Sequence, residues 1–519
     1  MEATAASVLH NERGMMPEPL EPGKNCAVPS LETEDFPERH KEVVQEGSAE
    51  GGKPQNWGDD AEGLLPSFSL SFTEESTKVG DLLDEEKKAL EDLKLLVREA
   101  MDKHQLSASV ANEKQQETKQ GGSGTREEHE VGKPVEVVKE AIVSVSSPLL
   151  SPYQDKATDP PEEEEVAGRA ISHKKSPEEV SIWGVPLLLD ERTDVILLKF
   201  LRAREFNVSD SLAMIKDTIR WRKEFGIEEL VDEDLGCGND FEKVVFMHGH
   251  DKEGHPVCYN VFGQFQDKEL YRKVLSDEEK RRRFLRWRIQ FLERSIRKLD
   301  FSPGGVSTIL QVNDLKHSPG LGKKELRQAT REALQVLQDN YPEFLAKQVF
   351  INVPWWYLAF CKMISPFLTQ RTKSKFVFAG PSKSVETLSR FISAEQIPVK
   401  YGGLGKDGDF GEEDGVNEIS MKAVSKHTIE FPIPQGAVVI WEIRVVGWEV
   451  KYGAEFAPSA ADSYTVIIQK CRKVAADDDP VICDSFKAGE GGKLVLTIDN
   501  PTTRKKKLLY RFKIKSTVY

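Results

Sequence analysis

The sequence has no long apolar run, no paired-cysteine motif and no pattern typical of a secretion signal. Its 519 residues are 39% hydrophobic and 30% charged, yet no stretch approaches the roughly 18 consecutive apolar residues of a membrane-spanning helix. The N-terminal residues lack the basic and then apolar layout of a signal peptide. The six cysteines are scattered without a CxxC pair, which favours reduced thiols. We therefore expect a cytosolic protein.

Motifs that would indicate an enzyme, a metal centre or a cofactor site are also missing. His248, His250 and His255 lie close together in the sequence, but no cysteine or carboxylate completes a zinc-type set with them. Residues 320–323 and 380–384 miss the spacing of a Walker loop and of a nucleophile elbow. The sequence thus predicts no catalytic residue, no metal, no cofactor and no enzymatic activity.

Charge is unevenly distributed along the chain. Residues 1–175 hold about 37 acidic and 20 basic side chains, whereas the remainder is slightly basic within a net charge of −14. This asymmetry argues against nucleic acid as a partner and leaves anionic membranes open for the basic part. Residues 1–80 and 105–177 contain many polar residues and few apolar ones. This composition predicts a disordered acidic arm at 1–80 and a disordered linker at 105–177.

Residues 81–104, between these two segments, carry leucines at helical spacing among Glu and Lys, which predicts an amphipathic helix. One isolated helix is marginally stable in water, so we expect it to pack on residues 181–235.

Two further patterns follow from residue 181 onward. Residues 194–206 and 211–225 read as helices, and beyond them strands alternate with helices, which predicts an α/β sheet with helical cover. The apolar strand at 349–353 is typical of a strand buried on both faces. The other strand candidates are 244–247, 256–262, 307–312 and 375–378, and the helix candidates are 277–298, 323–340, 356–368 and 383–394.

After residue 403 the pattern changes to strands alone. Trp441, Ile443 and Val445 alternate with Glu442 and Arg444, so that apolar and polar side chains should point to opposite faces. About 95 residues of this kind, separated by turn signals, predict a small β-sandwich.

Several motifs resemble those of known families. Residues 197–206 (Leu-Leu-Lys-Phe-Leu-Arg-Ala-Arg-Glu-Phe) resemble the N-terminal helical signature of CRAL-TRIO lipid-binding proteins, and residues 341–375 resemble their lipid-pocket core. Residues 441–456 resemble a GOLD domain, and the whole order behind an acidic arm is similar to that of the patellin family. The resemblance implies a multidomain chain. It would comprise a CRAL-TRIO helical lobe at 178–235, an α/β CRAL-TRIO lipid-binding domain at 236–405 and an all-β GOLD sandwich at 410–519.

The resemblance also implies a site for a lipid headgroup, made by Arg204, Glu343, Thr372 and Lys375, which match the residue types at the motif positions of phosphatidylinositol-binding members. Their chemistry fits, because a guanidinium and an ammonium suit a phosphodiester. Glu and Thr can hydrogen-bond inositol hydroxyls, and a site built for hydroxyls rejects choline lipids. From the residues alone, a solvated arginine, a helix-capping Glu343 and a lysine at the start of a strand remain alternatives.

Basic residues flank the predicted site. Arg371 and Lys373 stand beside Thr372, where transfer proteins of the family tend to be apolar. This departure favours polyphosphorylated inositides or an exposed headgroup over simple one-for-one transfer. Residues 356–370 are a candidate lid over the acyl chains, or an ordinary core helix. The basic stretches 280–298 and 505–515 could meet a membrane, or could cover a sheet and form a solvated face.

Taken together, the resemblance implies a protein of the cytoplasm and peripheral membrane that binds phosphoinositides or other phospholipids and an anionic membrane surface. It would meet trafficking proteins through the GOLD domain and act in membrane trafficking, with a role in cell-plate formation during cytokinesis. Two alternatives stay open: a trafficking adaptor with a vestigial pocket, and a carrier of a non-phosphorylated hydrophobic ligand.

Overall fold

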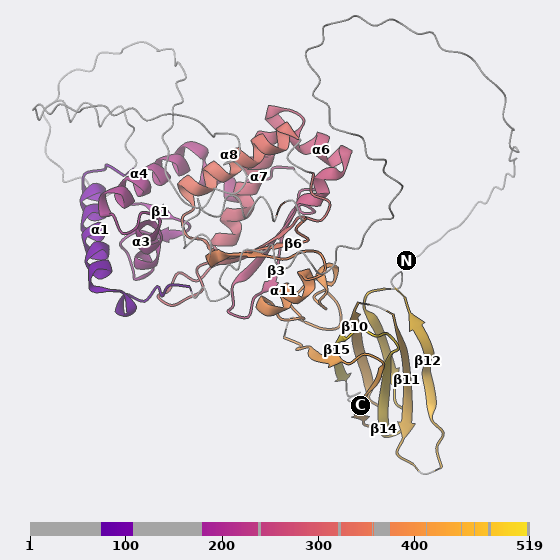
Figure 1. Ribbon diagram of the computed structural model, residues 1–519. Helices are drawn as coiled ribbons and strands as arrows, with labels where there is room; N and C mark the ends of the chain where they lie inside the picture. The colour runs from indigo at the N-terminus through magenta and orange to yellow at the C-terminus, as the bar shows by residue number, and fades with distance from the viewer. Residues whose placement is uncertain are drawn as a thin grey trace, which may run out of the picture. The chain divides into compact units, whose positions relative to one another are not determined.

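The computed structural model describes residues 74–106, 179–236, 240–319, 323–354, 357, 374–411, 413–447, 449–460, 462–475 and 479–515. Within these ranges the chain forms a helical lobe, an α/β domain around a five-stranded sheet, and an all-strand sandwich, as the sequence predicts (Figure 1). Within the same ranges, no helix has both the length and the apolar character needed to cross a bilayer.

The amphipathic helix α1 (Asp84–Asp102) packs on the helical lobe, where the sequence predicts it. Leu90, Leu93 and Val97 are fully buried in the same core as the apolar residues of the lobe. Lys94 adds an ion pair of 2.7 Å with Asp194. The lobe contains a short pair of strands, β1 (Ser181–Ile182) and β2 (Val185–Pro186), and the helices α3 (Arg192–Ala203), α4 (Val208–Phe225) and α5 (Ile227–Asp232).

Residues 74–80 differ from the sequence prediction, which places them in the disordered arm. They hold defined contacts with the folded domain, and the short helix η2 (Val79–Asp81) links them to α1. Thr77 is buried and its hydroxyl accepts a hydrogen bond of 2.8 Å from the backbone N–H of Gly304. Composition misled the prediction, because apart from the packing of Val79 on the core these contacts are polar and leave no apolar pattern in the sequence.

The central sheet has the strand order β3-β4-β5-β6-β7, with β3 antiparallel to β4 and the other neighbours parallel. Helices α6, α7 and α8 lie on one side of it and α11 on the other (Figure 1). The strands are β3 (Val245–His250), β4 (Pro256–Val261), β5 (Ile309–Asp314), β6 (Leu345–Ile351) and β7 (Phe376–Phe378). The helices are α6 (Lys268–Leu275), α7 (Glu278–Ile296), α8 (Lys324–Asn340) and α11 (Ser384–Phe391).

The two faces of this sheet are unlike each other. Val312 and Val349 are fully buried in the cluster that includes Leu388 of α11. The opposite face carries Asn313 and, beside it in register, Phe350, which is only partly buried. The segment 349–353 is thus fully buried on the α11 face and partly buried on the other, where Phe350 stacks on Phe378 with ring centres 4.9 Å apart.

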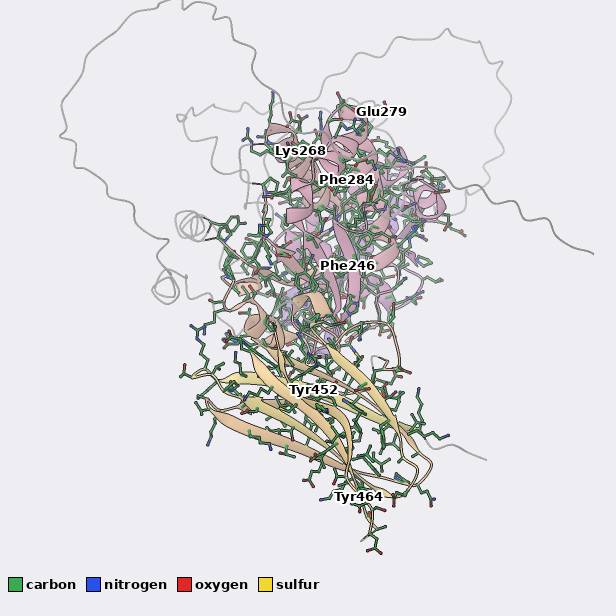
Figure 2. All side chains as sticks on the ribbon, turned by 90° about the vertical axis from the view of Figure 1, so that its right-hand side faces the viewer. Phe246, Lys268, Glu279, Phe284, Tyr452 and Tyr464 are labelled. Carbon is green, nitrogen blue, oxygen red and sulfur yellow. The ribbon has the colours of Figure 1, made fainter. Side chains whose placement is uncertain are left out.

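The C-terminal sandwich joins two four-stranded antiparallel sheets, with the orders β13-β10-β15-β8 and β12-β11-β14-β9. Trp441 of β10 donates a hydrogen bond of 2.9 Å to the Tyr452 hydroxyl of β11, which connects the sheets, and Figure 2 shows Tyr452 within them. The strands are β8 (Asn417–Met421), β9 (Ser425–Ile433), β10 (Val438–Val446), β11 (Val450–Pro458), β12 (Val466–Val474), β13 (Ile482–Lys487), β14 (Gly492–Asn500) and β15 (Lys506–Lys515).

One position in the sandwich departs from the predicted alternation. Glu442 is buried rather than exposed, because Arg511 lies opposite it on β15 and pairs with its carboxylate at 2.8 Å. Lys406 also reaches this carboxylate, at 3.1 Å. A charged residue at an outward position of a strand can therefore be buried when its partners come from neighbouring segments.

Candidate functional site

Several segments far apart in the sequence meet at the edge of the sheet where the parallel strands begin. Ser307 precedes β5, Glu343 precedes β6 and Lys375 immediately precedes β7. Because neighbouring parallel strands start at the same edge, these residues come together across about 70 positions of sequence. With Lys199 and Arg202 of α3 and residues of the 74–77 segment, they line a small pocket that is partly open to solvent.

Glu343 and Lys375 form the centre of this pocket. The Lys375 ammonium lies 2.7 Å from the Glu343 carboxylate, and Lys375 is buried. The backbone of Glu343 has a φ of 55°, in the left-handed region that non-glycine residues rarely adopt. Such a conformation is kept where surrounding structure enforces it, and it often marks a functional position.

Lys199 was missed by the sequence interpretation. Its ammonium donates hydrogen bonds of 2.9 Å to the carbonyl oxygens of Ser307 and Glu343 and lies 4.5 Å from the ring centre of Phe344. Burial lowers its pKa to about 7. One signal could have identified it: this lysine interrupts the apolar run 195–201, in which every residue is buried.

Arg202 also faces the pocket. Its Nε lies 2.9 Å from the Glu75 carboxylate, and its Nη2 donates to the carbonyl oxygen of Ser76 at 2.5 Å. Arg204 lies just beyond the last residue of α3, where its Nη1 donates to the carbonyl oxygen of Ala203 at 3.4 Å. Arg204 is the C-cap residue of α3, so its backbone has already left the helical conformation that Arg202 keeps.

Of the four residues predicted from the sequence, the structure brings Glu343 and Lys375 together. Arg204 is absent from the described residues that line the pocket. Thr372 and its neighbours Arg371 and Lys373 lie outside the described residues, as does the candidate lid at 356–370 apart from Tyr357. The binding roles of all four residues therefore stay predictions.

Glu74 reaches into the same pocket and forms a chain of polar contacts. Its carboxylate lies 3.0 Å from Nε2 of His255 and accepts a hydrogen bond of 3.0 Å from the Thr308 hydroxyl. Nδ1 of His255 lies 2.9 Å from the Asp251 carboxylate. Burial alone would lower the pKa of His255, but the hydrogen bonds to Asp251 and Glu74 outweigh it and raise that pKa to about 9. His255 is therefore a cation between two carboxylates at neutral pH.

Several apolar side chains of α8 and of the sheet are only partly buried. They are Leu326 and Leu337 of α8, which pack on the helical core, and Phe350 of β6 and Phe378 of β7, which belong to a separate cluster. Figure 2 shows Phe284 of α7, also partly buried, in the helical layer above the sheet. Partly exposed apolar side chains of this kind are the surface that an apolar ligand contacts.

The two basic stretches are mostly paired within the chain. In α7, Trp287 and Ile289 are buried, while arginines on the other side bind acidic residues, for example Arg286 with Glu233 at 2.6 Å. In β15, Lys507, Lys513 and Lys515 lie within 3.0 Å of carboxylates of Glu418, Asp414 and Asp409. Both patterns favour the structural interpretation of these stretches over a membrane surface.

Comparison with known proteins identifies relatives over most of the chain. It matches the families described as CRAL/TRIO, N-terminal domain (158–217), CRAL/TRIO domain (240–403) and Patellin-1-like, C-terminal GOLD domain (422–507). Patellin-3 of Arabidopsis thaliana is 52% identical over 489 residues, which cover 93% of this chain and 85% of that protein. Patellin-5 of the same organism is 62% identical over 340 residues, covering 64% of this chain and 51% of that protein.

A more distant relative carries an activity in its name. The phosphatidylinositol transfer protein SFH5 of Meyerozyma guilliermondii is 29% identical over 238 residues, which cover 42% of this chain and 67% of that protein. Together these similarities confirm the family resemblance and the fold class drawn from the sequence motifs.

Proposed function

This chain belongs to the patellin family, and we propose that it binds and carries a phosphoinositide. The phosphate of the headgroup would lie at the edge of the sheet beside Lys375, and the acyl chains would lie beneath α8. Lipid binding and transfer is the coarser activity that the relatives support. The choice of an inositol phosphate headgroup is our proposal.

The observation that carries this proposal is the gathering of cations around Glu343. Lys199, Arg202 and Lys375 converge from two distant segments on one pocket. Arginine and lysine are the side chains that recognise phosphate most strongly, the first in a planar fork and the second as a point charge. The Glu343 carboxylate among them can accept hydrogen bonds from sugar hydroxyls, which a choline headgroup does not offer.

The partly buried apolar side chains of α8, β6 and β7 would supply the other half of the binding energy. Burial of each acyl CH₂ group contributes about 0.8 kcal/mol, so two long chains gain on the order of 20 kcal/mol. A bilayer offers a similar gain, so exchange between protein and membrane is close to balanced. The headgroup contacts then decide which lipid is selected.

The test is lipid analysis of the purified full-length protein by mass spectrometry, followed by binding to phosphatidylcholine vesicles with and without phosphatidylinositol phosphate. We expect bound inositide in the wild type and an affinity about 10- to 100-fold lower for Lys375→Met, the range for losing a hydrogen bond to a charged group. Lys324→Met, at the exposed start of α8, is the matched control and should bind normally. Circular dichroism establishes that both variants are folded.

Two other results would overturn the proposal. Recovery of a hydrophobic molecule without phosphate would instead favour the carrier of a non-phosphorylated ligand. Absence of any lipid, with vesicle binding unaffected by Lys375→Met, would favour a trafficking adaptor whose pocket is vestigial.

At the level of the cell, we propose a peripheral membrane protein that acts in membrane trafficking and cell-plate formation, with the GOLD sandwich binding trafficking proteins. A fluorescent fusion should move from the cytoplasm to the cell plate in dividing cells, and Lys375→Met should reduce that signal. An unchanged cytoplasmic signal throughout division would contradict this assignment.

A further inference from the structure

The cationic pocket is covered by acidic residues of the chain's own N-terminal part. Residues 74–78 (Glu-Glu-Ser-Thr-Lys), here named the acidic strap, run across it. Glu74 lines the pocket and contacts His255, which is not among the described residues that line it, and Glu75 pairs with Arg202. Thr77 is hydrogen-bonded to the turn at Gly304.

The charges of the strap match those of the pocket. The cations Lys199, Arg202 and Lys375 and the carboxylate of Glu343 line the pocket apart from the strap. With all three cations protonated, these groups carry two net positive charges. The two strap carboxylates reduce this to zero. They stand where the negative charges of a phosphate ligand would be attracted, so strap and ligand compete for the same cations.

The strap is held by polar contacts, whereas the helix behind it is held by an apolar core. No apolar residue lies within 74–78, and the side chain of Glu75 is 44% exposed. In α1, by contrast, Leu90, Leu93 and Val97 are fully buried. Glu75 is exposed, so its ion pair with Arg202 contributes little to stability, whereas the contact of Glu74 with His255 is mostly buried. Opening the strap would break these polar contacts and leave the apolar core of α1 intact.

We propose that the acidic strap is a built-in competitor that occupies the phosphate-binding pocket in the free protein and is displaced when an inositol phosphate headgroup enters. This inference rests on the proposed function, since it assigns the ligand to the same cations. A segment that must open before ligand binds lowers the apparent affinity by the fraction of open molecules. The strap therefore sets the threshold of lipid charge at which the protein loads.

The experiment compares four full-length variants with the wild type. Glu74→Gln with Glu75→Gln removes the strap charges. Glu85→Gln with Asp92→Asn makes the same change of charge at exposed positions of α1. Lys375→Met disables the pocket, both alone and combined with the strap variant. The probes are phosphatidylcholine vesicles containing phosphatidylinositol phosphate, and soluble inositol trisphosphate.

We expect the strap variant to bind both probes about 5- to 150-fold more tightly than the wild type, the usual range for coupling between two competing contacts. The α1 control should match the wild type, and Lys375→Met should weaken binding in both backgrounds. A gain with vesicles alone would mean that strap removal creates a membrane-attracting surface rather than a vacant phosphate site, and would overturn the proposal.

Failure of the strap idea and failure of the headgroup site have different signatures. If Lys375→Met weakens binding but the strap variant binds no better than the wild type, the strap stays in place when ligand binds and does not compete with it. If Lys375→Met has no effect, the headgroup assignment fails and the strap proposal falls with it.

Hydrogen exchange on the unmodified protein provides a second measurement. Adding inositide should accelerate exchange at residues 74–81 and leave the centre of α1 unchanged. Increased protection of 74–81 on ligand binding would refute displacement, even if a strap variant failed to fold.

Discussion

The protonated His255 makes the stability of the α/β domain depend on pH in a defined direction. Its imidazole lies between the carboxylates of Asp251 and Glu74 and its side chain is only 6% exposed. Its pKa is about 9 in the folded protein, against an ordinary value of 6.5. The raised pKa means that folding favours the protonated form, so this stabilisation is complete below pH 6.5 and is lost as the pH rises through 9.

The size of the pH-dependent stabilisation follows from the pKa shift of His255. Each pKa unit corresponds to about 1.4 kcal/mol, so the pH-dependent part of the stability amounts to at most roughly 3.5 kcal/mol. We expect the free energy of unfolding of the wild type to exceed that of His255→Gln by a margin that shrinks by this amount between pH 6 and pH 10. The pKa of Lys199 is about 7, in the same range, but this lysine is present in both proteins, so its titration largely cancels in the difference.

The assay is urea unfolding of the full-length proteins at several pH values, followed by pulsed hydrogen exchange so that the α/β domain is distinguished from the sandwich. His427→Gln, in β9 of the sandwich, is the control and should leave the α/β domain unchanged. A difference between wild type and His255→Gln that stays constant from pH 6 to pH 10 would refute the ion-pair assignment.

Three substitutions test the packing around the site and in the sandwich. Leu93→Ala should destabilise the helical lobe by about 2–5 kcal/mol, because the side chain is fully buried under α1, and urea midpoints measure this. Glu293→Gln should lower the free energy of unfolding by about 3–5 kcal/mol, which thermal unfolding measures. The reason is that the buried guanidinium of Arg222 lies 2.6 Å from the Glu293 carboxylate and would lose its main charged partner. Trp441→Phe removes the hydrogen bond between the sheets and should lower the stability of the sandwich by about 1 kcal/mol, which calorimetry can detect. Unchanged unfolding in any of these variants contradicts the corresponding contact.

Local periodicity was sufficient to predict most elements. The leucine spacing of 81–104 predicted α1 and its docking, and alternation at Trp441 and Ile443 predicted strand β10 with these side chains buried. Such patterns indicate which side of a helix or strand faces the hydrophobic core. The same logic failed at Glu442, because burial there comes from partners on other segments and leaves no periodic signal.

The sequence by itself determined the fold class, the family and the choice of Glu343 and Lys375 as site residues, since these depend on short motifs and on the order of those motifs along the chain. Only the tertiary structure decided that Lys199 and Arg202 join them and that Glu74 reaches the same pocket. Those contacts form because parallel strands begin at one edge of the sheet and because the strap returns to residues nearly 300 positions away. Electrostatic partners at such separations need not share any local pattern, so their meeting follows from the fold alone.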